Sequence, residues 1–201
     1  MEKGVLIVIS GPSGAGKGTI CKRLLELKQS IKMSVSATTR DPRKGEIDGI
    51  NYFFVKEEEF KGRINKNEFL EYATVYGNYY GTPRSNVLKE IEEGNDVILE
   101  IDIQGALKVK EKYPEGVFIF ILPPSITELR NRIVGRGTDS KEVILRRMEC
   151  VYEELNYAFK YDYVVVNDLL DNAVEKIKCI ITAEKNKAHR KSELIEKIKE
   201  E

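Results

Sequence analysis

The feature that most constrains the fold is an apolar strand that runs directly into a glycine-rich loop and then a helix. Residues Val5–Ser10 form an unbroken run of β-branched and apolar side chains, typical of a strand covered on both faces. The loop GPSGAGKGT follows at residues 11–19, and Thr19–Leu27 carry apolar residues at helical spacing. A strand, a glycine loop and a helix in this order open an α/β domain.

The glycine loop predicts a binding site for a nucleoside triphosphate. Its glycines let successive backbone N–H groups turn inward around an anion, and the following helix N-terminus adds positive potential. Lys17 supplies a mobile charge for the β- and γ-phosphates. Position 18 is glycine where the common pattern has a Ser or Thr that ligates Mg²⁺, so we expect phosphates, water and a carboxylate to hold the metal. The predicted triphosphate site comprises Gly11, Pro12, Ser13, Gly14, Ala15, Gly16, Lys17, Gly18 and Thr19.

Similar apolar runs farther along the chain predict the rest of a parallel sheet. Helix-like segments separate them, which implies right-handed crossovers and helices on both faces of the sheet. The predicted strands are 97–101, 117–122 and 163–166, and the predicted helices are 105–112, 126–134 and 141–159.

The stretch between about residues 35 and 94 has a different texture. Glycines and a proline punctuate short strand-like runs at 52–55 and 69–75, which predicts a small inserted subdomain of mixed α/β structure. We predict a single domain over 1–201, with a core of 1–34 and 95–201, an inserted subdomain at about 35–94 and a helical lid at about 135–155. Residues 172–201 are expected to begin as a packed helix and end as a frayed tail.

Composition excludes several classes of function. The chain has 33 basic and 33 acidic residues, which gives no reason to expect a nucleic-acid or membrane partner. Its three cysteines form no C-x-x-C pair, and no apolar run reaches the ~18 residues of a membrane span. The N-terminus lacks a signal peptide, so we expect a cytoplasmic protein. The one histidine, His189, lies in a charged C-terminal stretch, which argues against chemistry built on a histidine base.

A second group of polar residues lies in the inserted stretch. Arg40 and Arg43 flank Pro42, and with Tyr52 they can form a rigid fork for a phosphate monoester. Glu71 comes shortly before the segment NYYGT at 78–82. Alone, loop arginines are usually solvated, and a tyrosine pair beside a glycine is more often hairpin packing than a site.

Taken together, the motifs resemble the guanylate kinase family. The segments that carry the resemblance are GPSGAGKGT, SVSATTRDPRKGEIDGINYFF, NYYGT, EIDIQG, GRGT and VVVND, in the order and spacing of that family, between about residues 4 and 183. The resemblance implies transfer of the γ-phosphoryl group of ATP to GMP, and we expect dGMP to serve too. It also implies Mg²⁺ as cofactor and in-line transfer with no general base.

The resemblance also implies roles for individual residues. Those expected to bind the GMP phosphate are Arg40, Arg43, Tyr52 and Tyr80, and those expected to read guanine are Ser36, Glu71 and Thr82. Asp102 is expected between the two nucleotides and near the metal, although alone it is equally a helix N-cap. The expected lid arginines are Arg132, Arg136 and Arg147, and Asn167 is expected beside the adenine of ATP. Glu100 departs from the family, because many members have Asp there.

The chemistry of these residues agrees with that reaction. The phosphate of GMP is already an anionic nucleophile, so catalysis consists of alignment and of neutralising charge on the transferring group. Water must be kept out, which calls for a lid and a moving acceptor subdomain.

Two alternatives remain open. Guanylate-kinase-like domains in scaffold proteins bind peptides instead of GMP, but this chain keeps Lys17 and the lid arginines. Adenylate kinases share the GKGT form of the loop, but the short arginine and tyrosine subdomain and Glu71 argue against them. The sequence leaves the oligomeric state open.

Overall fold

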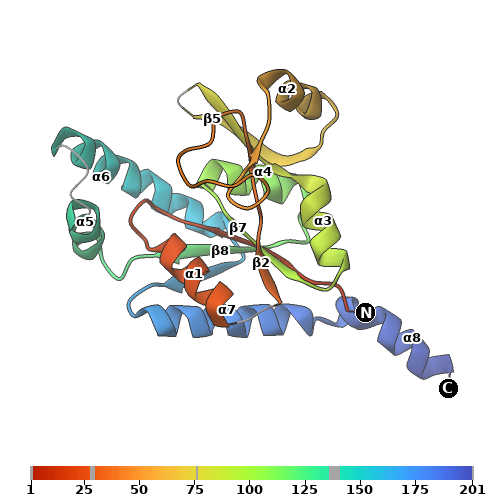
Figure 1. The fold of residues 1–201 in the computed structure, drawn as a ribbon. Coiled ribbons are helices and arrows are strands. Elements are labelled where there is room, and N and C mark those ends of the chain that lie inside the picture. Colours follow the sequence, from red (N-terminus) through yellow and green to blue (C-terminus); the bar gives the residue numbers. More distant parts are fainter. Residues whose placement is uncertain (1, 28–29, 76, 136–140, 201) are drawn as a thin grey trace.

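The structure is a computed structural model, and it describes residues 2–27, 30–75, 77–135 and 141–200, without the side chains of 141–147. Its centre is a sheet of five strands in the order β2-β7-β1-β8-β9 (Figure 1). Every strand pairing in this core sheet is parallel, as the alternation of strands and helices predicts. Its strands are β1 (Leu6–Ser10), β2 (Ile31–Met33), β7 (Asp96–Glu100), β8 (Val117–Leu122) and β9 (Tyr163–Val166).

The position of β1 explains why its sequence is apolar almost throughout. Leu6 lies opposite Val97 of β7, and Ile7 lies opposite Val117 of β8, so both edges of the strand are paired. All five residues of β1 are buried. A strand with neighbours on both edges and helices on both faces has no position that meets water.

Helices cover both faces of the core sheet, which confirms the predicted fold class. The helices α1 (Lys17–Leu27) and α7 (Leu170–Lys185) lie on one face, and α3 (Arg84–Glu92) and α4 (Ile103–Lys112) lie on the other (Figure 1). Odd-numbered side chains of β1 pack with α1 and α7, and its apolar even-numbered side chains pack with α3 and α4. The two clusters form the main hydrophobic core.

A second, smaller sheet lies within residues 37–83, with the strand order β4-β3-β6-β5. Strands β3 and β4 are parallel, whereas β6 is antiparallel to both β3 and β5. The helix α2 (Glu57–Asn65) covers this sheet by stacking Phe60 on Phe69, with 4.4 Å between ring centroids. Its strands are β3 (Ala37–Thr38), β4 (Phe53–Phe54), β5 (Phe69–Val75) and β6 (Asn78–Pro83).

Two crossings join the sheets. Residues 34–36 lead from β2 of the core sheet into β3 of the second sheet. The helix α3 leads from β6 of the second sheet back to β7 of the core sheet. Any movement of one sheet relative to the other has to be taken up in these crossings.

The region of the predicted lid is helical. It contains the end of α5 (Ile126–Gly135) and most of α6 (Lys141–Asn156), whose apolar faces meet at Leu129, Ile133 and Val151. The chain beyond α6 tightens into a 3₁₀ turn, η1 (Tyr157–Lys160), before β9. Residues 136–140 lie outside the described part of the chain.

The expectation of a frayed C-terminal tail is wrong. After α7 the chain forms a short 3₁₀ turn, η2 (Ala188–Lys191), and a further helix, α8 (Ser192–Glu200), in which no residue is buried. Good helix formers and an ion pair one turn apart, Lys199 to Glu196 at 2.6 Å, favour this helix without tertiary packing. None of the helices in the described segments has the length and apolarity that crossing a bilayer requires.

Candidate active site

The glycine loop leaves β1 at the carboxyl edge of the core sheet and opens α1. Its glycines are required by close contacts as well as by backbone angles. Gly11, Gly14 and Gly16 have φ angles of 141°, 89° and 90°, which side chains disfavour. A Cβ atom at Gly11 would also lie 2.4 Å from the carbonyl oxygen of Ile121. The loop is therefore held against β8, in the backbone conformation from which an anion-binding nest is built.

Lys17 turns back over the loop. Its Nζ donates to the carbonyl oxygens of Gly11 at 2.6 Å and Pro12 at 3.1 Å, so the ammonium lies at the mouth of the loop. The positive charge is therefore held next to the backbone that would surround the phosphates, which is the arrangement expected for a lysine that follows the β- and γ-phosphates.

Asn167 and Arg132 support the loop from behind. The buried amide of Asn167 donates to the carbonyl oxygen of Ala15 at 2.8 Å. Arg132 donates through Nη2 to the Asn167 carbonyl at 3.2 Å and through Nε to Glu128 at 2.8 Å. A Cβ atom at Gly16 would lie 2.3 Å from the Asn167 amide nitrogen, so the glycine allows this close approach. The contact of Asn167 with adenine stays a prediction.

The other lid arginines are described less fully. Arg136 lies outside the described residues. Arg147 belongs to α6, but its side chain is not among those described. Their expected contact with the transferring phosphoryl group stays a prediction.

Arg40, Tyr52 and Tyr80 come together on the second sheet. The Tyr52 and Tyr80 rings lie 6.0 Å apart, and the Arg40 guanidinium carbon lies 5.6 Å from the centre of the Tyr52 ring. The Glu46 carboxylate raises the pKa of Arg40, with a smaller contribution from the Tyr80 hydroxyl. Arg43 is exposed at the edge of this group. The structure thus assembles most of the cluster that the sequence predicts for a phosphate monoester.

Glu46 belongs to the same cluster, although the sequence did not single it out. Both of its carboxylate oxygens lie 2.9 Å from Nη2 of Arg40, and one also accepts the Arg43 backbone N–H at 2.7 Å. The Arg43 N–H lowers the pKa of Glu46, and Arg40 adds to this effect. The only sequence signal was its spacing, since Glu46 follows Arg40 and Arg43 at intervals of three.

Glu71 and Thr82 form a buried polar pair on neighbouring strands. The Thr82 hydroxyl donates to Glu71 Oε1 at 2.7 Å, and Thr82 and Glu71 are 0% and 8% exposed. Burial raises the pKa of Glu71, the Thr82 hydrogen bond acts against this shift, and the Asp102 carboxylate adds to it. A buried carboxylate is costly, which favours a ligand that supplies further donors.

Asp102 caps a helix and lies near Glu71. Its Oδ1 accepts the backbone N–H of Gly105 at 2.7 Å, which caps α4. A Cβ atom at Gly105 would lie 3.4 Å from both Asp102 Oδ1 and Glu71 Oε2. The two carboxylates therefore converge over the first turn of α4, and Gly105 leaves the space between them open.

A cleft of about 390 Å³ lies between the two sheets. Its walls include Ser36, Tyr52 and Thr82 from the second sheet and its approach, and Glu100 from the end of β7. Of the residues predicted to read a base, Ser36 and Thr82 line this space directly, and Glu71 is bonded to Thr82.

Glu100 reaches the glycine loop in spite of its departure from the family pattern. A Cβ atom at Gly18 would lie 3.5 Å from both oxygens of the Glu100 carboxylate. Burial raises the pKa of Glu100, and the Lys17 ammonium acts against this shift. A carboxylate oxygen is a donor that Mg²⁺ prefers, so the residue fits a metal bound next to the phosphates. Among the described residues, no three His, Cys, Asp or Glu side chains cluster as an all-protein metal site would require.

Glu154 is a further acidic residue near the loop that the sequence did not indicate. Burial raises the pKa of its carboxyl, and Lys17 and the backbone N–H of Ser13 act against this shift. It belongs to α6, which packs through Val151 on α5. Glu154 lies among exposed polar residues of a helix in sequence, so no local signal could have revealed it.

The comparisons with known proteins identify the family. The family model described as guanylate kinase matches residues 3–184. The guanylate kinase of Caldanaerobacter subterraneus is 66% identical over 200 residues, which cover 100% of this chain and 97% of that protein. That of Clostridium tetani is 61% identical over 94% of this chain and 91% of its own.

A solved structure agrees with these relatives. The crystal structure of guanylate kinase from Anaplasma phagocytophilum matches with a TM-score of 0.72 and 38% identity, over 94% of this chain and 90% of that one. A phosphate loop backed by a parallel sheet, opposite a cluster for a phosphate monoester and a buried carboxylate, is what such an enzyme needs. The chain therefore belongs to the guanylate kinase family.

Proposed function

We propose that the cleft between the two sheets is where this chain carries out its family's reaction, the transfer of a phosphoryl group from ATP to GMP. ATP would bind through its phosphates to the loop of residues 11–19, and GMP would lie against the second sheet. The observation that carries the proposal is Glu71, whose carboxylate is buried beside the cleft and paired with Thr82. A carboxylate kept from water in this way favours a ligand with two adjacent donors, such as N1–H and the 2-amino group of guanine.

The reading of the base then follows from hydrogen-bond complementarity. An ionised Glu71 accepts both guanine donors at once, and the hydroxyls of Ser36 and Thr82 are available to guanine O6. Without a ligand the Thr82 hydroxyl donates to Glu71. Binding of guanine would therefore turn this hydroxyl away from the carboxylate and towards O6.

The phosphate of GMP would bind at Arg40, Arg43, Tyr52 and Tyr80. Glu46 holds Arg40 through both of its oxygens, so the guanidinium is oriented before the ligand arrives. A pre-oriented arginine loses less conformational entropy when it binds an anion. In this proposal residues 35–94 act as the GMP-binding subdomain.

The transfer step relies on charge and alignment. A GMP phosphate oxygen attacks the γ-phosphorus of ATP in line and the bond to the ADP oxygen breaks, so no proton has to be removed by a base. Lys17 stabilises the charge on the transferring group, and Arg132, Arg136 and Arg147 of the proposed lid add to it on closure. Closure excludes water, which would otherwise accept the phosphoryl group.

Glu100 and Asp102 are the residues that would hold Mg²⁺, together with the phosphates and water. Their carboxylates belong to the end of β7 and the start of α4, beside the loop and the cleft. Mg²⁺, when bound with ATP, supplies positive charge against the β- and γ-phosphates.

The test of this function is a coupled assay of ADP formation with ATP, Mg²⁺ and each of GMP, dGMP, AMP, CMP and UMP. We expect turnover with GMP, and with dGMP, and a kcat/KM for AMP lower by roughly 10⁴-fold. Equal rates with AMP and GMP would refute the proposed role of Glu71 and point to a different acceptor.

Replacement of Arg40 by alanine is expected to raise the KM for GMP roughly 5- to 10-fold, with the KM for ATP near the wild-type value. Arg40 contacts the acceptor phosphate in this proposal and lies on the second sheet, away from the loop that holds ATP. Initial rates over a range of both substrates measure the two constants. Lys44→Ala is the matched control, because Lys44 is an exposed cation of the same loop. A parallel loss of ATP affinity in the Arg40 variant would show that the acceptor site is misassigned.

A further inference from the structure

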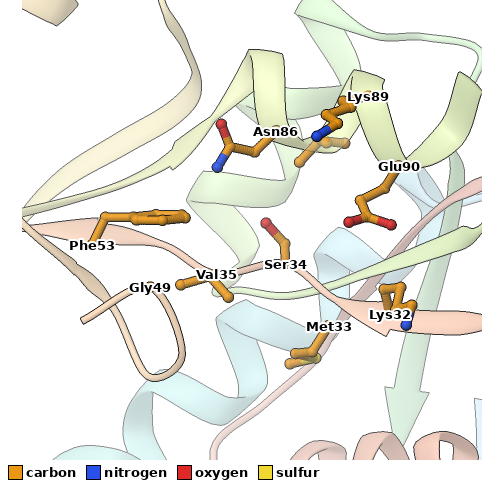
Figure 2. Close-up of a pocket in the computed structure, with 10 residues that line it drawn as sticks. Lys32, Met33, Ser34, Val35, Gly49, Phe53, Asn86, Lys89 and Glu90 are labelled. Atoms are coloured by element: carbon orange, nitrogen blue, oxygen red, sulfur yellow. The ribbon is translucent and has the colours of Figure 1, made fainter. Parts of the chain in front are cut away.

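A second cavity lies behind the substrate cleft, between the two crossings that join the sheets. It has a volume of about 340 Å³ (Figure 2). Lys32 and Ser34 line it on the side of the first crossing, and Asn86 and Lys89 of α3 line it on the side of the second. Phe53 closes one end, with its ring directed into the space (Figure 2).

One short segment separates this cavity from the substrate cleft. Met33, Ser34 and Val35 line both spaces, so the first crossing is a wall that the two cavities share. The Ser34 N–H donates to Ile98 of the core sheet at 2.9 Å, and the Phe53 N–H donates to Ser36 at 2.9 Å. The wall is thus tied to one sheet at its start and to the other sheet at its end.

The second crossing is tied in the same way. At the start of α3 the Arg84 N–H donates to Glu68, next to β5, at 2.8 Å. Towards the end of α3 the Ile91 carbonyl accepts the Gly4 N–H at 2.8 Å, and Ile91 is buried in the core. If the two sheets approach one another, both crossings must bend, and the space between them must change shape.

The lining of the cavity favours a small planar anion. The lining includes two exposed lysines, Lys32 and Lys89, and one half-buried carboxylate, that of Glu90. The Glu90 carboxylate already accepts a hydrogen bond from the Asn95 side-chain amide, with 2.8 Å between Nδ2 and Oε2. The Lys89 Nζ lies 3.9 Å from Oε1 of Glu93. Ser34 and Asn86 add neutral hydrogen-bonding groups, and the Phe53 ring offers an apolar face for stacking.

We propose that this cavity is a second small-molecule site, which takes a planar anion such as an aromatic carboxylate and thereby controls the approach of the two sheets. An occupant bridging Lys32 and Ser34 to Asn86 and Lys89 holds the crossings apart. Since transfer requires the sheets to close around the substrates, occupancy lowers kcat. The effect on kcat rests on the proposed function, whereas binding to the cavity does not.

The binding test uses the wild-type protein and free 2-nitrobenzoate, titrated calorimetrically. We expect saturable binding that persists when the cleft is filled with GMP. Replacing both Lys32 and Lys89 by alanine should weaken this binding about 10-fold, because two charge-assisted contacts are lost. No saturable binding, complete displacement by saturating GMP, or unchanged affinity in the double variant would each overturn the proposal, whereas a limited weakening by GMP is expected because closure opposes occupancy.

The functional test places the same chemical group in the cavity covalently. In a background with the exposed Cys150 and Cys179 changed to serine, Asn86→Cys is treated with 5,5′-dithiobis(2-nitrobenzoate). The introduced thiolate displaces one thionitrobenzoate and forms a mixed disulfide with the other, a planar anion. The remaining Cys21 is buried, and burial raises its pKa to about 12, so it stays unmodified.

We expect the labelled Asn86→Cys protein to lose kcat at least about fivefold, and dithiothreitol to restore it. Ser85→Cys is the matched control, since Ser85 and Asn86 are neighbouring exposed residues of α3 and only Asn86 lines the cavity. Labelling there, or methylthiolation at position 86, should leave kcat unchanged. Equal losses of kcat on labelling at positions 85 and 86, or no loss at position 86, would refute the proposal that an occupant of the cavity opposes closure. An unlabelled protein that fails to phosphorylate GMP would instead count against the proposed function, and the wild-type titration would still decide the binding site.

Discussion

Replacement of Lys17 by alanine is expected to lower kcat by ~10³-fold or more while the protein stays folded. The Lys17 ammonium lies over the loop, on the carbonyl oxygens of Gly11 and Pro12. From there it can follow the charge that develops on the transferring phosphoryl group, and no other described lysine contacts this loop in the same way. Steady-state rates with saturating ATP and GMP measure the loss, and circular dichroism and thermal unfolding check the fold.

Lys22→Ala is the control for this experiment. Lys22 lies on the same helix, α1, and is exposed. It should retain wild-type turnover. A folded Lys17 variant with near-normal turnover would show that the loop is not the catalytic phosphate site.

Replacement of Glu71 by glutamine is expected to lower kcat/KM for GMP by about 10- to 100-fold and to narrow the ratio of GMP to AMP. Glutamine keeps the size of the side chain and can still accept the Thr82 hydrogen bond, but it exchanges one acceptor for a donor that faces a guanine donor. Assays of the variant with GMP and AMP measure both quantities. Glu58→Gln, an exposed change on α2, is the control. If both quantities stay at wild-type values, guanine is read elsewhere.

The pH dependence of the same pair of proteins gives a second, independent check. Burial raises the pKa of Glu71 above that of an ordinary glutamate, so Glu71 becomes protonated at a higher pH as the solution is acidified. On acidification, the wild-type kcat/KM for GMP should therefore begin to fall at a higher pH than it would if Glu71 were exposed. The Glu71→Gln variant should lack this limb of the profile.

The raised pKa also has a consequence for stability. The folded state binds the proton of Glu71 more tightly than the unfolded state, so this contribution to stability is lost as the pH rises from the unfolded pKa through the raised one. At neutral pH the ligand-free Glu71→Gln protein should be at least as stable as the wild type. If the variant had a lower Tm than the wild type at neutral pH and a higher Tm in acid, the predicted direction of this pH dependence would be wrong.

The sequence predicted the core elements well because their signals are local. The bounds of β5, β8 and β9 match the predicted runs, since a strand buried in a sheet needs a continuous or alternating apolar sequence. Strand β6 was not predicted, because NYYGTP contains a glycine and a proline that locally favour a turn. Its extended conformation depends on pairing with β5, which immediately precedes it, and with β3, which lies far from it in sequence.

The candidate site was predictable where a local sequence motif carried it. Arg40, Tyr52 and Tyr80 come together as expected. Glu46 and Glu154 were missed, because their importance depends on which groups the fold brings near them. Asp102 was predicted both as a site carboxylate and as an N-cap, and the structure confirms the cap.

The contact between Gly18 and Glu100 has a consequence for how this loop can change in evolution or by design. A Cβ atom at position 18 would lie in ordinary contact with both carboxylate oxygens, at 3.5 Å, so the hydroxyl of a serine there would be close enough to donate to Glu100. A side chain at position 18 and the acid at position 100 would then share one hydrogen bond. Substitutions at the two positions are therefore expected to be coupled, and a redesign of the loop has to treat both together.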